Sequence, residues 1–110
     1  AIGLKHGVKR EQFILDPGIG FGKTVEQNLE IIKHLDDFAS FKLPIAIGIS
    51  RKSHLGKIFE TDLVLTTSTL ERLEGTLAET AIAVQNGATI VRTHDVLATN
   101  KFLTVLNKLL

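Results

Sequence analysis

The residues best suited to chemistry fall into three short clusters, each placed directly after an apolar stretch of the chain. The clusters read DPGIGFGKT at Asp16–Thr24, GISRKS at Gly48–Ser53 and RTHD at Arg92–Asp95. A carboxylate accepts N–H bonds from the edge of a nitrogen heterocycle, whereas Arg, Lys and His side chains donate to anions. Together the clusters predict a site in which one carboxylate faces a heterocycle and two cationic groups face anions.

The first cluster combines a carboxylate, Asp16, with a glycine-rich loop and one aromatic side chain, Phe21. It is not a phosphate-binding P-loop, because that motif requires a glycine where Pro17 stands. We expect Asp16 to bind the edge of a heterocycle and Phe21 to stack on a ring. The alternative is that Asp16 and the glycines only form a turn and that Phe21 belongs to the core.

The second cluster places cations where a helix is expected to begin. Arg51 and Lys52 fall in the first turn of a helix that Ser50 is predicted to cap, and the helix dipole disfavours cations there. This placement favours an anion or polar ligand at the helix start, to which Ser53 also donates. Gly48 would let a flat ligand approach the strand. The alternative is a solvated basic surface.

In the third cluster, Arg92 and His94 are two residues apart, so on a strand both side chains point to the same face. An Arg fork with a His donor suits a phosphate or pyrophosphate. Asp95 is interpreted as the cap of the following helix. The alternative is a surface Arg92 and a structural His94. The other histidines are expected on the surface: His6, His34 and His54.

Short apolar strands that alternate with helices must position these clusters. The sequence predicts a helix end over Ala1–Gly7, strands at Phe13–Leu15, Ile45–Ile49 and Ala88–Val91, and helices over Val25–Asp37, Ser50–Phe59, Leu70–Val84 and beyond Asp95. Apolar strands between helices are typical of α/β proteins with a parallel sheet. The ends of such strands form the ligand-binding edge, and all three clusters fall there.

Local signals refine this assignment. Capping boxes begin helices at Thr24 and Ser68, and Asn86–Gly87 is a helix stop. Gly75 inside a helix predicts a close packing contact, because glycine there is unfavourable by about 1 kcal/mol relative to alanine. The strand ends are about 34 and 42 residues apart, close to the ~31 residues per unit of a (β/α)₈ barrel. The chain is therefore expected to hold about three and a half such units.

Composition excludes several classes of protein. The 110 residues carry a formal net charge of +1, which provides no field for nucleic acid or an anionic membrane. The absence of Cys excludes disulfides and thiolate metal sites. No apolar stretch reaches the length of a membrane span. The chain also contains no Met, so we expect that it does not begin at a translation start.

Four segments, in order and at matching spacing, resemble dihydropteroate synthase: DPGIGFGKT, GISRKS, RLEGTLAETA at Arg72–Ala81 and GATIVRTHDV at Gly87–Val96. That family is a TIM barrel that joins para-aminobenzoate to 6-hydroxymethyl-7,8-dihydropterin pyrophosphate in folate synthesis, and sulfonamides inhibit it. The resemblance implies an α/β fold of parallel (β/α) units, with residues 1–110 forming the last three units of one incomplete barrel domain.

The resemblance also implies roles for the clusters. Asp16 would bind the pterin's amino-pyrimidine edge, Lys52 would bond the ring, and Gly48 and Phe21 would flank the substrates. Ser53 would hold the aminobenzoate carboxylate, with Arg51 in support. Lys52, Arg92 and His94 would be the catalytic group, the last two holding the leaving pyrophosphate.

The resemblance further implies a cytoplasmic homodimer that uses Mg²⁺, whose protein ligand is expected upstream of Ala1. Because earlier strands and covering loops are also expected there, these 110 residues alone are predicted to lack synthase activity.

Two other functions fit the sequence. One is the related pterin-binding domain of corrinoid-dependent methyltransferases, which shares the barrel and the strand-end carboxylate. GISRKS and RTHDV favour the synthase, because methyl transfer has no pyrophosphate to hold. The other is a non-catalytic fragment that associates with itself through an open sheet edge or apolar helix faces.

Overall fold

The structure, a computed structural model, describes residues 6–110, without the side chains of Arg10, Thr69 and Leu70. Its elements in chain order are η1 (Arg10–Gln12), α2 (Val25–Lys33), η2 (Leu35–Phe41), β1 (Ala46–Ile47), α3 (Ser53–Leu63), η3 (Thr69–Arg72), α4 (Leu73–Gln85), β2 (Ile90–Val91) and α5 (Val96–Leu109). The helix end predicted over Ala1–Gly7 lies mostly outside the described residues. Strands that alternate with helices confirm the α/β class.

The strands are parallel and follow one another in sequence order. Ala46 and Ile47 of β1 pair with Ile90 and Val91 of β2, and a single parallel bridge joins Leu15 to Ile45 on the other side of β1. Each strand therefore runs in the same direction, and the three clusters follow their carboxyl ends. The predicted parallel arrangement is confirmed.

The strands are shorter than predicted. Phe13–Leu15 forms only that one bridge, and Ile14 is 55% exposed. On the far side of the described sheet, Ile90 is 37% exposed. A strand buried on both faces needs neighbours on both sides, and neither outer strand has a second neighbour within residues 6–110.

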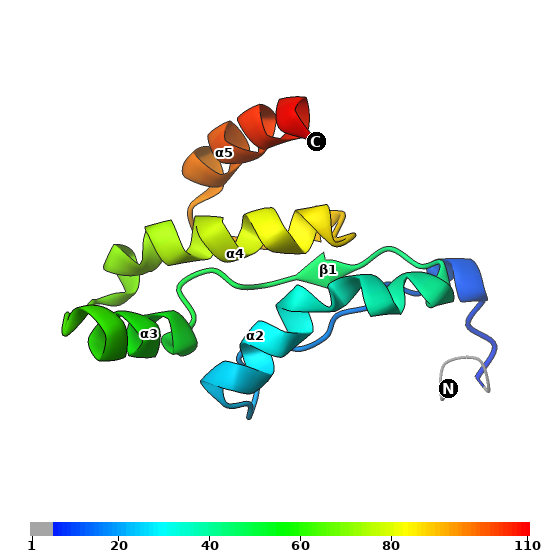
Figure 1. Cartoon of the computed structure of the whole chain (residues 1–110). Coiled ribbons are helices and arrows are strands. Elements are labelled where there is room, and N and C mark those ends of the chain that lie inside the picture. The colour runs from blue at the N-terminus through cyan, green and yellow to red at the C-terminus, as the bar shows by residue number, and fades with distance from the viewer. Residues whose placement is uncertain (1–5) are drawn as a thin grey trace.

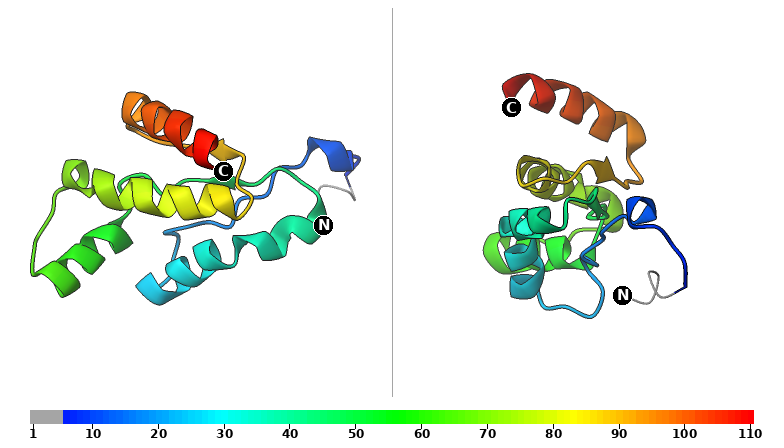
Figure 2. Two further views of the ribbon diagram at one scale, coloured as in Figure 1. Left: turned by 45° about the horizontal axis from the view of Figure 1, so that its top comes forward. Right: turned by 90° about the vertical axis from the view of Figure 1, so that its right-hand side faces the viewer.

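Figure 1 shows β1 between α2 and α4, with α3 beyond its carboxyl end and α5 on the other side of α4. The right-hand view of Figure 2 shows α5 at one edge of the molecule, beyond α4. The radius of gyration is 15.1 Å, larger than the roughly 13 Å expected of a compact domain of this length. Exposed apolar side chains on α5, including Val96, Leu97 and Leu109, agree with this open shape.

The core forms where the helices cover β1. Its buried side chains come from the glycine-rich loop, α2, η2, β1 and its flanks, α3, α4 and the start of the last strand: Ile19, Ile32, Leu35, Ile45, Ile47, Ile49, Leu55, Ala83 and Ala88. This cluster fixes the strand ends relative to the helices, and so it positions the loops that carry the candidate site. None of the described helices has the length and apolar character needed to cross a membrane.

The helix predicted over Val25–Asp37 ends earlier, at Lys33. Its capping box at Thr24 and Gln27 is present, as expected. At its other end the Asn86 amide donates to the carbonyl oxygens of Ile32 and Lys33, at 3.0 Å each. These acceptors would otherwise serve the next turn of the helix, so the chain continues as η2 instead. A residue distant in sequence therefore stops α2.

Helix α4 buries polar side chains more completely than its leucines. Thr76, Glu79 and Thr80 are buried, whereas Leu73 and Leu77 are only half-buried. The two threonine hydroxyls donate to the carbonyls of Arg72 and Thr76, at 3.1 and 2.7 Å, which satisfies them locally. The capping box at Ser68 and the stop at Asn86–Gly87 are present as predicted.

Gly75 lies in close contact with α3, as predicted. A Cβ atom at this position would stand 3.0 Å from Leu55 Cδ2 and 3.1 Å from Phe59 Cζ. We expect Gly75→Val to lower the free energy of unfolding by about 1–3 kcal/mol through overpacking. Urea denaturation measures this change in the free energy of unfolding, and Ala78→Val, on the exposed face of the same helix, is the control. Equal effects at the two positions would contradict the packing role of Gly75.

Candidate functional site

The loops after the three strands enclose an open cleft of about 220 Å³. Its walls are Phe21, Gly48, Ser50, Lys52, Arg92, Thr93 and His94, which come from all three clusters. Three larger hollows, two of about 570 Å³ and one of about 450 Å³, contain none of the predicted site residues. The cleft is therefore the place where the predicted chemistry converges.

Asp16 borders this cleft and is already paired. Its Oδ2 atom accepts a 2.7 Å bond from Arg92 Nη2, and its Oδ1 accepts the Gly18 N–H at 2.9 Å. The side chains of Arg92 and Asp16 are 61% and 36% exposed. An ion pair this exposed contributes about 0–1 kcal/mol, so a ligand can separate the two groups at little cost. Residues predicted to hold opposite ends of a ligand thus contact each other.

The glycine-rich loop carries Phe21 to the mouth of the cleft. Phe21 is 67% exposed, and Lys52 Nζ lies 4.4 Å from its ring centroid as a cation–π contact. The expectation that Phe21 is free to stack agrees with this exposure, and a core position for it is wrong. Phe21 and Lys52 both remain accessible to a ligand at this mouth.

Asn28 on α2 anchors this loop and was not singled out in the sequence. It is 1% exposed, and its Oδ1 accepts the Gly20 N–H at 2.8 Å. Gly20 has φ +85°, and a Cβ there would also meet Lys52 Cδ at 2.9 Å. A buried polar residue on a helix start beside a glycine-rich loop is the signal that could have found Asn28.

The absence of a side chain at Gly48 allows the Arg92 guanidinium to lie against the neighbouring strand. A Cβ at Gly48 would lie 2.8 Å from Arg92 Nη2, so a larger residue would displace the guanidinium. The close approach predicted at Gly48 is therefore present, although in this structure the group against it is a side chain of the protein. Gly48 sets the depth at which Arg92 lies in the cleft.

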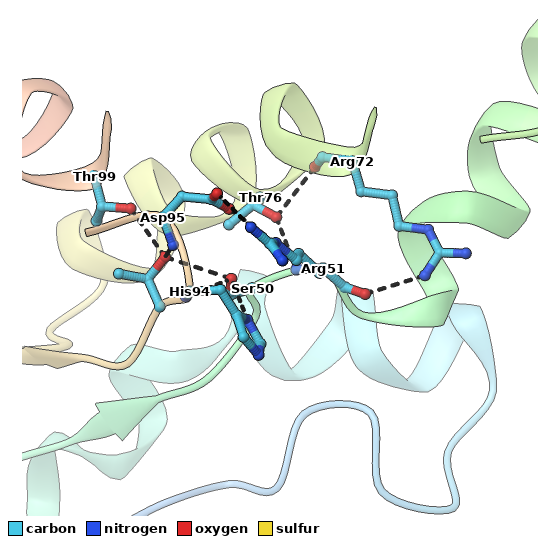
Figure 3. A network of polar contacts seen from close by, with 8 residues as sticks. Ser50, Arg51, Arg72, Thr76, His94, Asp95 and Thr99 are labelled. Carbon is cyan, nitrogen blue, oxygen red and sulfur yellow. Dashed lines mark hydrogen bonds and ion pairs between the residues drawn. The ribbon is translucent and has the colours of Figure 1, made fainter. Parts of the chain in front are cut away.

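Arg51 and Ser53 are not in the cleft wall. Arg51 adopts φ +57° and precedes the helix, whose N-cap is Lys52, so the placement of both cations in its first turn is wrong. The Arg51 guanidinium instead donates to Asp95 at 2.7 and 3.2 Å (Figure 3). Ser53 is exposed at the first position of α3.

Asp95 and Ser50 also differ from their predicted capping roles. Asp95 stands at the N-cap of α5 but makes no side-chain capping bond, because its carboxylate is bound to Arg51. Ser50 caps no helix; its hydroxyl accepts the His94 N–H at 3.0 Å and contacts His94 Nδ1 at 2.9 Å. Ser50 and Thr93 are the two cleft residues to which the sequence had assigned no binding role.

The Arg51–Asp95 pair ties the second loop to the third. Arg72 donates to the Arg51 carbonyl at 3.1 Å, and the Arg51 N–H donates to Thr76 at 3.2 Å, as Figure 3 shows. Hydrogen bonds from Arg51 hold the pKa of Asp95 below its ordinary value and raise the pKa of Arg51. This network holds the loops on which Lys52, Arg92 and His94 stand.

The lowered pKa of Asp95 predicts an acid-dependent contribution to stability. A carboxyl group with a depressed folded pKa stabilises the protein above its unfolded pKa, and the contribution disappears as the pH falls through the folded value. We therefore expect Asp95→Asn to lower the free energy of unfolding near neutral pH and to flatten its decline below about pH 4. Urea denaturation across this range measures both. Parallel pH profiles for the two proteins would contradict the assignment.

His54 is buried, so its predicted surface position is wrong. It is 3% exposed, and its Nε2 lies 2.6 Å from Glu79 Oε1 between α3 and α4. His34 does lie on the surface, where it pairs with Glu30 at 3.3 Å. The pattern of α4 gave no sign that a glutamate on it would be buried against a histidine on α3.

The described residues do not form a metal site. Among residues 6–110, no three or more His, Asp or Glu side chains converge in a way that would hold a metal ion. Asp16, at the border of the cleft, is paired with Arg92 and accepts the Gly18 N–H.

The fold and cleft define a parallel α/β protein with an open cleft at the carboxyl ends of its strands. Comparison with known proteins specifies the class further, because the family described as pterin binding enzyme matches residues 2–94. This chain belongs to the pterin binding enzyme family.

The similar proteins are dihydropteroate synthases, which confirms the resemblance. The Clostridium beijerinckii enzyme is 48% identical over 96 residues, covering 86% of this chain and 34% of that protein. The Haemophilus influenzae enzyme is 39% identical over 102 residues, covering 93% and 35%. The Clostridium difficile enzyme, solved in the presence of pteroic acid, superposes with a TM-score of 0.86 at 38% identity, covering 98% of this chain and 39% of that one. The chain thus spans about a third of the length of these curated relatives.

Proposed function

We propose that this chain contributes the strand-end cleft of a dihydropteroate synthase, which joins para-aminobenzoate to 6-hydroxymethyl-7,8-dihydropterin pyrophosphate. One observation carries the proposal: residues up to 76 positions apart converge on one cleft, with a carboxylate beside cationic and aromatic groups. The relatives named above support it, since they are dihydropteroate synthases. Residues 1–110 would then be the last three (β/α) units of one TIM-barrel domain.

The reaction proposed is a substitution at the pterin methylene carbon. The bond from this carbon to the pyrophosphate oxygen breaks, and the electron pair leaves with the pyrophosphate. The amine nitrogen of para-aminobenzoate then bonds to the carbon and releases a proton to solvent. The protein's tasks are to stabilise the leaving anion and to align the two substrates.

Within this reaction, Arg92 and His94 would donate to the departing pyrophosphate. Asp16 would accept N–H bonds from the amino-pyrimidine edge, and Lys52 would bond the ring from the other side. The Asp16–Arg92 pair has to open when substrate enters, and its exposure makes that exchange inexpensive. Each partner then gains a charge-assisted bond to the substrate in place of the one it gives up.

The second loop would serve para-aminobenzoate. Phe21 and Gly48 would flank the two ring systems, and Ser53 would hold the carboxylate at the start of α3, where helix N–H groups favour anions. Arg51 would support this end through the loop it fixes with Asp95 rather than by direct contact, since its guanidinium is bound there. Sulfonamides would compete at this place.

Mg²⁺ would neutralise charge on the pyrophosphate when bound. Since residues 6–110 supply no cluster of three or more metal ligands, its protein ligands would come from outside them. Arg92 and His94 would contact the same pyrophosphate from this side of the cleft.

A homodimer is proposed on the exposed apolar surface. Leu63 and Val64, at the end of α3, are 64% and 90% exposed, and Val105 on α5 is 61% exposed. Burial of such side chains against a second copy would stabilise association. Size-exclusion chromatography with light scattering tests this, and a Val64→Asp variant should shift a dimer towards the monomer. A monomer at all concentrations would contradict it.

Ligand titration tests the function. We expect the chain to bind the dihydropterin pyrophosphate weakly and saturably, to bind no methyltetrahydrofolate, and to show no synthase turnover by itself. A chimera in which the chain replaces the matching third of the Clostridium beijerinckii enzyme should regain turnover. Binding of methyltetrahydrofolate would instead favour the methyltransferase alternative, and an inactive but folded chimera would contradict the proposal.

A further inference from the structure

A row of three hydroxyl groups leads from α5 to the ring of His94. Thr99 Oγ1 lies 3.1 Å from Thr93 Oγ1, which lies 3.4 Å from Ser50 Oγ, which lies 2.9 Å from His94 Nδ1. Figure 3 shows Thr99, Ser50 and His94 beside the Arg51–Asp95 pair. Thr99 and Ser50 are buried, at 4% and 6% exposure, whereas His94 is exposed in the cleft wall.

The buried end of the row sets its direction. Thr76, Thr80 and Thr104 each donate their hydroxyl proton to the carbonyl four residues earlier in the helix. Thr99 makes no such bond, and Thr93 Oγ1 is its hydrogen-bond partner among the described residues. A buried hydroxyl proton without an acceptor is unfavourable, so Thr99 donates to Thr93.

The remaining donors and acceptors then follow by counting. Thr93 Oγ1 accepts from Thr99 and from the Asp95 N–H at 3.1 Å, which fills both lone pairs, so its own proton goes to Ser50. Ser50 Oγ accepts this proton and the His94 N–H. Its lone pairs are filled in turn, so its own proton points to His94 Nδ1.

We propose that the hydroxyl row Thr99–Thr93–Ser50 holds neutral His94 in the tautomer that carries its proton on Nε2. With Nδ1 used as an acceptor, the ring presents an N–H donor at its other nitrogen, which has no protein partner within residues 6–110. Ser50, Thr93 and Thr99 are thus positioning residues. The Nε2–H group is oriented for a phosphate-type oxygen, and this last clause rests on the proposed function.

Without the row, neutral His94 would exist as a mixture of its two tautomers. In the tautomer that carries the proton on Nδ1, the Nε2 atom would present a lone pair to the anion. A lone pair repels a pyrophosphate oxygen, whereas an N–H attracts it. Fixing the tautomer therefore makes His94 a donor even when the ring is uncharged. Hydrogen bonds of this row connect α5 and the loop after β1 to His94 in the cleft.

Long-range proton–nitrogen NMR of the histidine-labelled chain measures the tautomer directly. At a pH well above the ordinary histidine pKa, we expect the His94 signals to show an unprotonated Nδ1 and a protonated Nε2. The signals are assigned by their loss in His94→Gln. A dominant Nδ1–H tautomer in the unsubstituted chain would overturn the proposal, and this measurement needs no other variant.

Two valine variants on α5 provide a matched pair. Thr99→Val removes the first donor of the row without touching His94, and Thr104→Val removes an exposed hydroxyl bonded to its own helix. We expect Thr99→Val to lower the Nε2–H to Nδ1–H ratio roughly three- to tenfold and Thr104→Val to leave it unchanged. Ser50→Ala should lower the ratio at least as much. An unchanged ratio in Thr99→Val would overturn the proposal, even if Ser50→Ala fails to fold.

Titration with inorganic pyrophosphate separates this inference from the proposed function. If both hold, pyrophosphate shifts the His94 Nε2–H signal, and the shift weakens in Thr99→Val. The expected tautomer with no response to pyrophosphate would contradict the anion role while leaving the row intact. The opposite tautomer would contradict the row whether or not pyrophosphate binds.

Discussion

Glu79→Ala is expected to lower the free energy of unfolding by about 3 kcal/mol, because it leaves His54 buried without its partner. The two side chains are 2.6 Å apart and 3% and 10% exposed, so water cannot replace the lost bond. His54 Nδ1 and Glu79 Oε2 are already buried without hydrogen-bond partners, so this contact is the main compensation for burying both groups.

The chain contains its own control for this prediction. His34 and Glu30 form a second His–Glu pair, at 3.3 Å, with side chains 63% and 60% exposed. Glu30→Ala should change the free energy of unfolding by less than about 0.5 kcal/mol, as expected of an exposed pair within one helix. Urea denaturation of both variants measures the difference. If the two variants lost similar amounts of unfolding free energy, burial would not explain the contribution of Glu79 to stability.

Arg92→Ala is expected to weaken the binding of the dihydropterin pyrophosphate far more than the binding of para-aminobenzoate. The lost bond to the pyrophosphate is charge-assisted, and such bonds contribute about 1.5–3 kcal/mol, or roughly 10- to 150-fold in affinity. The change also frees Asp16 from its 2.7 Å contact with Arg92, so the pterin edge itself should lose nothing. The effect should therefore depend on the pyrophosphate group.

The measurement compares both substrates in the chimera, and a pterin without pyrophosphate serves as a third ligand. Arg92→Lys keeps the charge without the planar fork and should recover only part of the loss. Lys101→Ala, an exposed cation on α5, is the control for a general change in charge. If Arg92→Ala weakened the binding of the dihydropterin pyrophosphate and of para-aminobenzoate equally, the role of Arg92 would be contradicted.

Much of the site followed from local sequence. The sequence predicts a common site for residues at or just after the ends of apolar stretches, and all of them lie in or beside one cleft: Asp16, Phe21, Gly48, Lys52, Arg92 and His94. Parallel strands bring their carboxyl ends together whatever helices connect them. The position of each cluster along the chain was therefore sufficient to predict that the clusters meet. The capping boxes also followed from local sequence, since each depends on residues three positions apart. A glycine inside a helix predicted the close contact at Gly75, although its partners Leu55 and Phe59 lie on another helix.

Periodicity and capping are properties of neighbouring residues, and so they were enough to predict the parallel α/β order and the loops that meet. The side-chain pairs that form across those loops could not be predicted in this way. Arg51 turned to Asp95, 44 positions away, Asn86 ended α2, and His54 became buried against Glu79. Such pairings depend on strand register and on the helix faces brought into contact, and no local pattern specifies either.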